Sequence, residues 1–191
     1  MYDISMNYRV TSLWELINTL SHESLLNVIS SFSCKMNTDV ETFLKEKAIV
    51  QEKKQISRTY LIFTNDPITN LAAYFTIAVS CMNVGGLECS NELRKKMNIN
   101  DGLAQSYLIG QLGKHDGSQK GLGKFALHSA LELIKDANAK VGCRLLRIDC
   151  KPSLIKYYTE NGFIHVKCNR DGDLELMIKL IDPGIALQSS P

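Results

Sequence analysis

Two glycines close a short turn, Ser118–Gly123, at the point where a strand-like pattern of residues gives way to a helical one. The first four N–H groups of a helix have no acceptor within it, and the positive end of the helix dipole lies beside them. A phosphate group is therefore the expected ligand of this turn. A Gly-x-Gly turn also occurs in tight loops that bind nothing, so the turn alone leaves both interpretations open.

A second segment, Ile155–Phe163, carries two adjacent phenols, Tyr157 and Tyr158. A positioned phenol can give its proton to a leaving group. Aromatic residues at the junction of a helix and a strand more commonly pack in the core, and the residues alone favour that interpretation.

Four further residues could take part in chemistry. His115 precedes Asp116 and could act as a base, although a polar loop pair is the commoner role of such neighbours. His128 and His165 fall on or near the expected core faces and are interpreted as structural. Cys150 could carry an acyl group, but a buried cysteine usually behaves as a small hydrophobic residue.

The cysteines and the apolar pattern restrict the class of protein. The six cysteines include no Cys-x-x-Cys pair, and no histidine lies at zinc-ligand spacing, which argues against a metal site. No apolar run approaches the roughly 20 residues of a membrane span, and residues 1–10 are too polar for a signal peptide. The chain is therefore expected to be cytoplasmic and soluble, with reduced thiols and no membrane partner.

The charge pattern gives no sign of a strong nucleic-acid field. The formal net charge is +2, which is close to neutral. Basic clusters at Lys53-Lys54 and Arg94–Lys96 are more often solvated charge than nucleic-acid contacts. A position on the same face as an active site would favour nucleic-acid contact.

The elements around the turn form a strand–helix–strand unit. Ser106–Lys114 is a predicted strand that contains Gly110 and Gly113. Such glycines indicate a bulge or the close approach of another backbone or a ligand, and the adjacent turn favours the ligand. The helix after the turn is amphipathic and ends at Val141-Gly142, and Leu145–Cys150 is the next predicted strand. This order places the turn at the top of a crossover connection.

The remaining elements complete an α/β pattern. A capping box at Ser12–Glu15 predicts a helix to about His22, and another at Thr38–Glu41 predicts a second helix. The run Leu25–Phe32 is apolar and β-branched enough to predict the first strand. The other predicted elements are a hairpin of Tyr60–Thr64 with Leu71–Met82 around Asn65–Pro67, short helices at Asn91–Met97 and Lys156–Glu160, and a hairpin of Phe163–Cys168 with Leu174–Ile181 around Asn169–Asp173.

Several of these segments resemble a known family. Ile155–Phe163 resembles the F-Y-x-x-x-G-F signature of the GNAT N-acetyltransferases and lies at the usual distance from the phosphate turn. Other segments resemble the GNAT toxins of toxin-antitoxin modules, which acetylate the amine of aminoacyl-tRNA. These segments are Phe32–Cys34, Val40–Leu44 with Ala48, Ser57–Leu61, Leu93–Lys96 and Leu108–Leu112.

The resemblance implies an α/β (α+β) GNAT fold, with a mixed central sheet flanked by helices. It covers most of the chain from Leu25 onward and divides it into an N-terminal helical extension (1–24), a single acetyltransferase domain (25–181) and a flexible tail (182–191). It also implies acetyl-CoA as cosubstrate, with its pyrophosphate on the amides of Gln119–Lys124 and its pantetheine arm on the backbone of Leu112 and Lys114. Tyr158 matches the family's tyrosine and would protonate the departing thiolate. The expected cofactor-binding residues are Leu112, Gly113, Lys114, Ser118, Gln119, Lys120, Gly121, Leu122, Gly123 and Lys124.

The chain departs from the family's pattern in three ways. Ser118 stands where Gln or Arg is usual, the approach to the turn at His115–Gly117 is about one residue shorter, and the chain is less basic than the toxins. The expected reaction is direct transfer of an acetyl group to a primary amine in a ternary complex. The acceptor is the amine of aminoacyl-tRNA or, alternatively, of a small molecule or protein. A non-catalytic domain that binds acetyl-CoA or a partner is the other alternative, and the resemblance leaves an antitoxin partner and a homodimer open.

Overall fold

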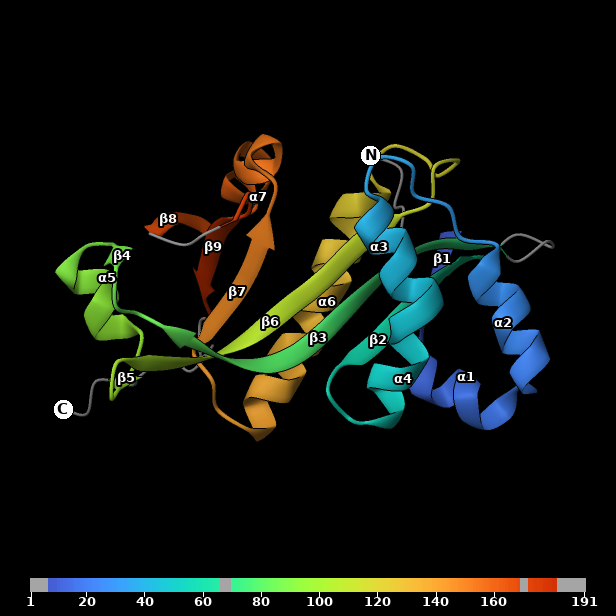
Figure 1. Ribbon diagram of the computed structural model, residues 1–191, viewed down its shortest axis with the longest axis horizontal. Coiled ribbons are helices and arrows are strands. Elements are labelled where there is room, and N and C mark those ends of the chain that lie inside the picture. Colours follow the sequence, from blue (N-terminus) through green and yellow to red (C-terminus); the bar gives the residue numbers. More distant parts are fainter. Residues whose placement is uncertain (1–6, 66–69, 169–171, 182–191) are drawn as a thin grey trace, which may run out of the picture. The chain divides into compact units, whose positions relative to one another are not determined.

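The computed structural model describes residues 7–65, 70–168 and 172–181, which fall into two compact units (Figure 1). The first unit comprises the chain up to Ala78 together with Ile109–Ile134, and the second comprises Val79–Leu108 and the chain from Lys135 onward. Two long strands and one long helix contribute residues to both units. In the described part of the chain, nine strands form one mixed sheet.

The strands of the first unit run in the order β1, β2, β3, β6. β1 (Tyr8–Ser12) pairs antiparallel with β2 (Arg58–Thr64), and β2 pairs antiparallel with β3 (Leu71–Asn83), with an irregularity in register at Ile62/Phe63. β6 (Leu103–Lys114) is the last strand of this unit.

In the second unit, β6 pairs in parallel with β7 (Leu145–Cys150) over Ser106–Leu108. β7 then pairs antiparallel with β9 (Glu175–Leu180), β9 with β8 (Ile164–Cys168), and β8 with the short β4 (Leu87–Glu88). β5 (Ile99–Asn100) forms a hairpin with β6 through Asp101 and Gly102, which both have positive φ, as such two-residue turns require.

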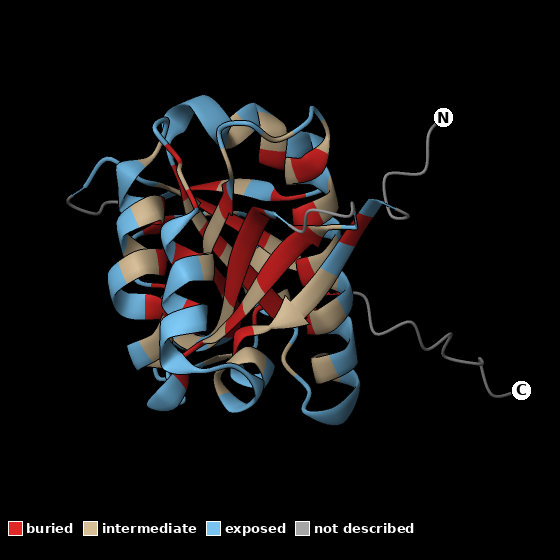
Figure 2. Ribbon diagram, turned by 90° about the vertical axis from the view of Figure 1, so that its right-hand side faces the viewer, coloured by how far each residue is buried: buried red, intermediate tan, exposed pale blue. Residues whose placement is uncertain are grey.

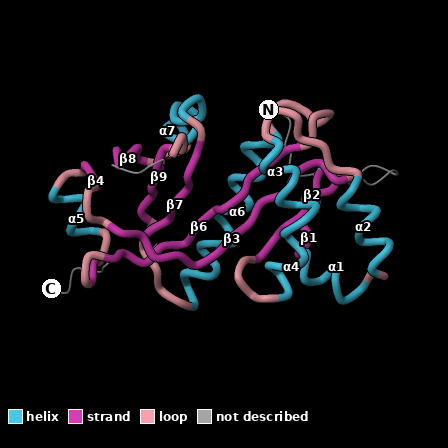
Figure 3. The backbone as a smooth tube through the Cα atoms, viewed as in Figure 1, coloured by secondary structure: helices cyan, strands magenta, loops and turns pink. Residues whose placement is uncertain are grey.

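Helices cover the strands of the first unit (Figures 2 and 3). They are α1 (Leu13–Thr19), α2 (His22–Ser30), α3 (Thr38–Thr42), the π-helical η2 (Phe43–Lys47) and α4 (Ala48–Lys53). Their apolar residues, which include Leu13, Ile29 and Leu44, are buried together with Phe32 and Tyr74 in one core cluster. α6 (Leu122–Lys140) begins in this unit and buries Leu122, Ala126, Leu127, Ala130 and Ile134.

The second unit has its own core. Met82, Met97, Leu145 and Ile178 belong to one buried cluster of this unit. Its short helices are α5 (Asn91–Lys96), the 3-10 helix η3 (Pro152–Leu154) and α7 (Ile155–Glu160). None of the described helices combines the length and apolar character that a membrane-spanning segment requires.

The prediction of a strand at Leu25–Phe32 is wrong, because this segment is mostly helix α2. Ser21 caps the helix, its side chain accepting a hydrogen bond from the N–H of Ser24. Leu25 and Ile29 lie four residues apart and are both buried, which is the spacing of one helix face. The β-branched residues of the segment favoured a strand, whereas the four-residue spacing of Leu25 and Ile29 correctly indicates a helix.

The two capping boxes also differ from the prediction. Ser12 is the N-cap of α1 but forms no side-chain capping bond, and it ends a strand, β1, that the sequence did not predict. Asn37, rather than Thr38, is the N-cap of α3. Glu41 instead accepts a hydrogen bond from the N–H of Cys34 at 2.7 Å, which ties the preceding loop to the helix.

The other predicted elements are present, with small differences at their ends. The division of the chain at residues 24 and 181 stays a prediction. The turn residues Asp66 and Pro67, most of the turn after β8 and the tail from Asp182 lie outside the described residues.

A buried carboxylate joins α4 to β2 in the first unit. Glu52 is fully buried, and its Oε2 accepts a hydrogen bond from the N–H of Thr59 at 2.6 Å, while Oε1 accepts one from Arg58 Nη1 at 2.7 Å. Glu52→Ala should lower the free energy of unfolding by about 1–3 kcal/mol, because the buried Thr59 N–H loses its acceptor. Urea unfolding measures this loss. Glu46→Ala, at an exposed position of η2, is the matched control and should change little.

Candidate functional site

The turn before α6 is held by its own hydrogen bonds. The Oγ of Ser118 donates to the carbonyl of Ala72 on β3 at 2.7 Å, and its N–H donates to the carbonyl of His115 at 2.9 Å. Both donors of Ser118 are therefore used within the protein. A serine in place of Gln or Arg fastens the turn to β3 and leaves no donor of its own for a ligand.

Four backbone N–H groups of the turn remain available. The N–H groups of Leu122 and Lys124 donate to Gln119 and Gly121 carbonyls. Of the N–H groups of this turn, those of Gln119, Lys120, Gly121 and Gly123 have no acceptor among the described residues. Gly121 has φ +97°, a left-handed conformation that lets successive N–H groups point outward. Such a cluster at a helix start suits an anion, and the exposed Lys120 and Lys124 add positive charge.

β6 offers a second set of donors in the same unit. The N–H of Gln111 donates to Thr76 Oγ1, and the N–H of His115 donates to the carbonyl of Ala72, so alternate amides of β6 face β3. The N–H groups of Leu112 and Lys114 therefore point to the opposite edge of the strand. An extended ligand that carries amide groups could pair with this edge.

Packing explains the glycine at position 113. A Cβ on Gly113 would collide with Val40 Cγ1 and would contact Tyr74 and Phe32, all of which belong to the core of the first unit. The glycine thus makes room for a core side chain, whereas the sequence had suggested the approach of a ligand. The backbone of Gly113 remains part of the edge that Leu112 and Lys114 present.

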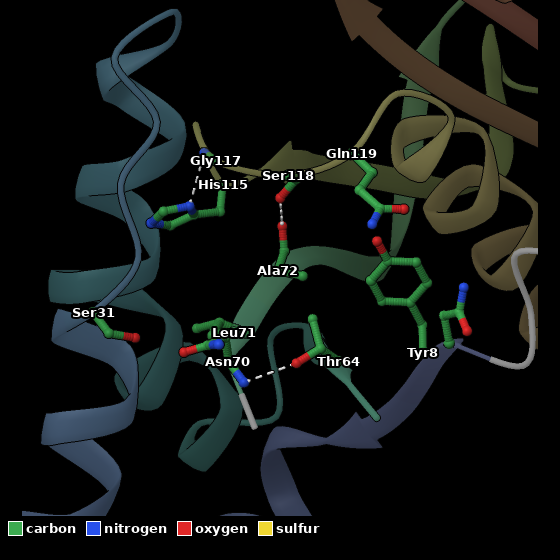
Figure 4. A pocket seen from close by; sticks show the side chains of 11 residues that line it. Tyr8, Ser31, Thr64, Asn70, Leu71, Ala72, His115, Gly117, Ser118 and Gln119 are labelled. Atoms are coloured by element: carbon green, nitrogen blue, oxygen red, sulfur yellow. Dashed lines mark hydrogen bonds between the residues drawn. The ribbon is translucent and has the colours of Figure 1, made fainter. Parts of the chain in front are cut away.

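A pocket of about 450 Å³ adjoins the turn (Figure 4). His115, Ser118 and Gln119 line it from the turn, while Tyr8 and Asn70 line it from the ends of strands. Among the described residues its lining contains no Lys, Arg, Asp or Glu, and this part of it suits neutral hydrogen-bonding groups better than a phosphate. No motif in the sequence indicated this pocket, because its residues come from five separate segments.

His115 and Asp116 do not form a catalytic pair. Asp116 accepts hydrogen bonds from Ser33 Oγ at 2.8 Å and from the N–H of Lys35 at 3.1 Å, and these bonds lower the pKa of its carboxyl. The Nδ1 of His115 accepts a hydrogen bond from the N–H of Gly117 at 3.0 Å. Both side chains therefore fix the loop, in agreement with the structural interpretation.

Tyr158 lies on α7 in the second unit, with 4% of its surface exposed. Its ring packs edge-on against Tyr157 and Phe163, at centroid distances of 5.1 and 5.6 Å. Burial raises the pKa of the Tyr158 phenol far above its ordinary value, and the nearby Cys150 adds to the rise. The phenol is therefore neutral at physiological pH and able to donate a proton.

Tyr157 differs from Tyr158 in one respect. Among the described residues, its hydroxyl is buried and has no hydrogen-bond partner, and burial raises its pKa. A phenylalanine would fill the same space without leaving a polar atom unpaired.

Comparison with solved structures identifies the fold. The chain superposes on the crystal structure of a Tyr-to-Phe mutant of KacT with a TM-score of 0.72 and 22% identity, covering 91% of this chain and 95% of that one. It superposes on AtaT complexed with acetyl-methionyl-tRNAfMet with a TM-score of 0.69 and 19% identity, covering 90% and 94%. For AtaTR bound with AcCoA the TM-score is 0.66 at 16% identity, covering 92% and 94%.

The protein has the GNAT fold. This confirms the fold predicted from the sequence, and the structures it resembles are those of GNAT toxins. No protein-family model matches the sequence, and no curated protein matches it. At these identities the likeness shows the fold alone.

The three remaining candidate residues are His128, His165 and Cys150. His128 is exposed on α6, so its predicted place near the core is wrong. His165 Nε2 lies 2.7 Å from Glu175 Oε2 between neighbouring strands. Burial raises the pKa of Cys150 to about 11, which keeps it a thiol at neutral pH, unsuited to acyl transfer.

The basic residues of this chain differ in whether their charged groups are bonded within the protein. Arg94 donates to the carbonyls of Val84 and Leu87 and holds the turn before β4. Lys45 and Lys96 pair with Glu41 and Glu92 at 2.6 and 2.5 Å. Of the basic clusters at Lys53-Lys54 and Arg94–Lys96, the lysines that have no ion pair in the described part of the chain are Lys53, Lys54 and Lys95.

Proposed function

We propose that this protein transfers the acetyl group of acetyl-CoA to a primary amine. The proposal rests chiefly on the turn before α6, where four N–H groups have no acceptor among the described residues and form a cluster that suits a phosphate. The turn would hold the pyrophosphate, and the β6 edge at Leu112 and Lys114 would pair with the pantetheine arm. Structures with this fold include AtaTR bound with AcCoA.

The chemistry assigned to the chain is direct transfer. The amine nitrogen attacks the thioester carbonyl, a C–N bond forms, and the C–S bond breaks. A backbone N–H of the β6 edge would stabilise the carbonyl oxygen as it gains negative charge. Tyr158 would give its phenol proton to the departing thiolate and regain it from water, while the nitrogen releases its proton to solvent.

The amine of aminoacyl-tRNA is the acceptor that we propose. AtaT, which has a similar fold, has been seen with acetyl-methionyl-tRNAfMet, and a further AtaT structure contains acetyl-CoA and the C-terminus of the antitoxin AtaR. An antitoxin would then be a partner of this chain as well. A small-molecule or protein amine is the second candidate, and the net charge of +2 favours it because a polyanion gains little from a near-neutral surface.

Transfer of label from acetyl-CoA to different amines distinguishes these candidate acceptors. The protein is incubated with purified aminoacyl-tRNA, a polyamine and a lysine peptide in parallel, at a series of salt concentrations. Labelled aminoacyl-tRNA is expected, in amounts that fall steeply with salt, because each neutralised phosphate releases a counterion.

Two other results would change the proposal. Product on the polyamine or peptide alone, with none on tRNA at low salt, would leave an acetyltransferase with a different acceptor. Binding of acetyl-CoA without any acetylated product would leave a domain that binds the cosubstrate and does not catalyse transfer.

A further inference from the structure

Helix α5 is anchored in the second unit by one of its faces. Leu93 packs against the core of this unit, and Met97, which follows the helix, is buried. The guanidinium of Arg94 donates to the carbonyls of Val84 and Leu87 at 3.2 and 2.9 Å. These contacts fix the helix and direct Lys95 and Lys96 away from the core.

Two adjoining hollows lie beside these lysines. One has a volume of about 690 Å³ and is lined by Lys95 and Lys96 of α5 and by Arg144, which precedes β7. The other has a volume of about 520 Å³ and shares Lys95 and Asn98 with the first. The remaining polar residues of the larger hollow are Asn98, Gln105, Asn138 and Cys143, and none of the described Asp or Glu residues lines either hollow.

The cations of these hollows differ in how far they are neutralised. Lys96 is paired with Glu92 at 2.5 Å. In the described residues, Lys95 and Arg144 have no acidic partner. Asn138 Oδ1 accepts a hydrogen bond from the N–H of Cys143 at 2.7 Å and so fixes the turn that leads into Arg144. Lys95 of α5 and Arg144, just before β7, therefore line one hollow and are paired with none of the described carboxylates.

We propose that these hollows bind the phosphodiester backbone of an RNA, with Lys95 and Arg144 as its principal phosphate contacts. This inference rests on the proposed transfer to aminoacyl-tRNA. Two open hollows that share a lysine suit a chain of phosphates better than a single phosphate ion, and their amide side chains can bond to ribose or phosphate oxygens. Within the basic cluster of α5, Lys95 would bind phosphate, whereas Arg94 stabilises the fold through its hydrogen bonds to Val84 and Leu87.

The test compares the binding of deacylated tRNA to the wild type and to a Lys95→Gln/Arg144→Gln variant, by fluorescence anisotropy over a series of salt concentrations. Loss of two phosphate contacts should weaken binding roughly 10- to 100-fold at about 0.1 M salt, and the slope of log K against log salt should become shallower by about 1.5. The affinity for acetyl-CoA, measured by calorimetric titration, should equal that of the wild type, because neither residue belongs to the proposed cosubstrate site.

A Lys47→Gln/Lys53→Gln variant is the matched control. It loses the same charge at exposed positions of η2 and α4, and its tRNA affinity should stay within about twofold of the wild type. Equal losses in both double variants, or an unchanged salt slope in the first, would overturn the inference. Failure of the proposed function is distinguished by the wild type, which would then give no acetylated aminoacyl-tRNA.

Discussion

Tyr158→Phe is expected to lower the turnover number by about 10²- to 10⁴-fold, the usual contribution of a positioned general acid. Acetyl-CoA affinity should change little, because the substitution removes one oxygen and keeps the ring that packs against Tyr157 and Phe163. Steady-state kinetics on the best acceptor amine and calorimetric titration with acetyl-CoA measure the two quantities separately.

The pH dependence gives a second readout of Tyr158. Because burial raises the pKa of its phenol, the proton stays in place throughout the range from about pH 6 to 9. Activity should therefore rise with pH as the acceptor amine loses its proton, and no falling limb should arise from Tyr158 in this range. A falling limb that disappears in Tyr158→Phe would contradict a phenol that stays protonated.

Tyr157→Phe is the matched control for this prediction. The hydroxyl of Tyr157 is buried and has no partner among the residues that the structure describes, so its removal should raise the free energy of unfolding by about 1 kcal/mol. The turnover number should stay close to that of the wild type. Equal turnover in Tyr158→Phe and Tyr157→Phe would return Tyr158 to a packing role.

The sequence predicted best those elements whose local and global preferences agree. α6 was predicted because its apolar residues recur on one face, and that face is the one buried in the protein. The turn of Gly121 was predicted because two glycines directly before a helical pattern are typical of a sharp turn from strand to helix, and the structure places Gly121 at a positive φ. The segment of Tyr158 depended on a family resemblance, since its residues alone favoured packing.

The failures have physical causes in the contacts between elements. β1 has only five residues, and its pairing with β2 depends on a partner almost fifty residues away, which no local pattern encodes. Gly113 looked like a ligand contact because the sequence does not show that Val40 lies against it. Ser118 stays a predicted cofactor-binding residue, and its hydrogen bond to Ala72 adds a structural role that the sequence does not show. The hairpin of β5 and β6 had a usable signal, Asp101-Gly102, which was missed.

The second prediction concerns the backbone N–H groups of the turn before α6. Gly123→Leu should weaken acetyl-CoA binding about 10- to 100-fold, the equivalent of one or two lost hydrogen bonds to a charged group. The side chain would obstruct the anion that the N–H groups of Gly121 and Gly123 are proposed to bind. Calorimetric titration measures the affinity, and urea unfolding without ligand measures the stability.

Gly123 separates ligand binding from folding better than Gly121 does. Gly121 has φ +97°, so any other residue there would add backbone strain of about 1–2 kcal/mol and would lower stability and affinity together. Gly123 has no positive φ and lies in the first turn of α6, where replacing glycine should leave the helix as stable as before or more so. Gly142→Leu is the control, because a Cβ there meets nothing within 4 Å. If Gly123→Leu binds acetyl-CoA as tightly as Gly142→Leu does, the pyrophosphate does not lie on this turn, and the loop is only a tight connection between β6 and α6.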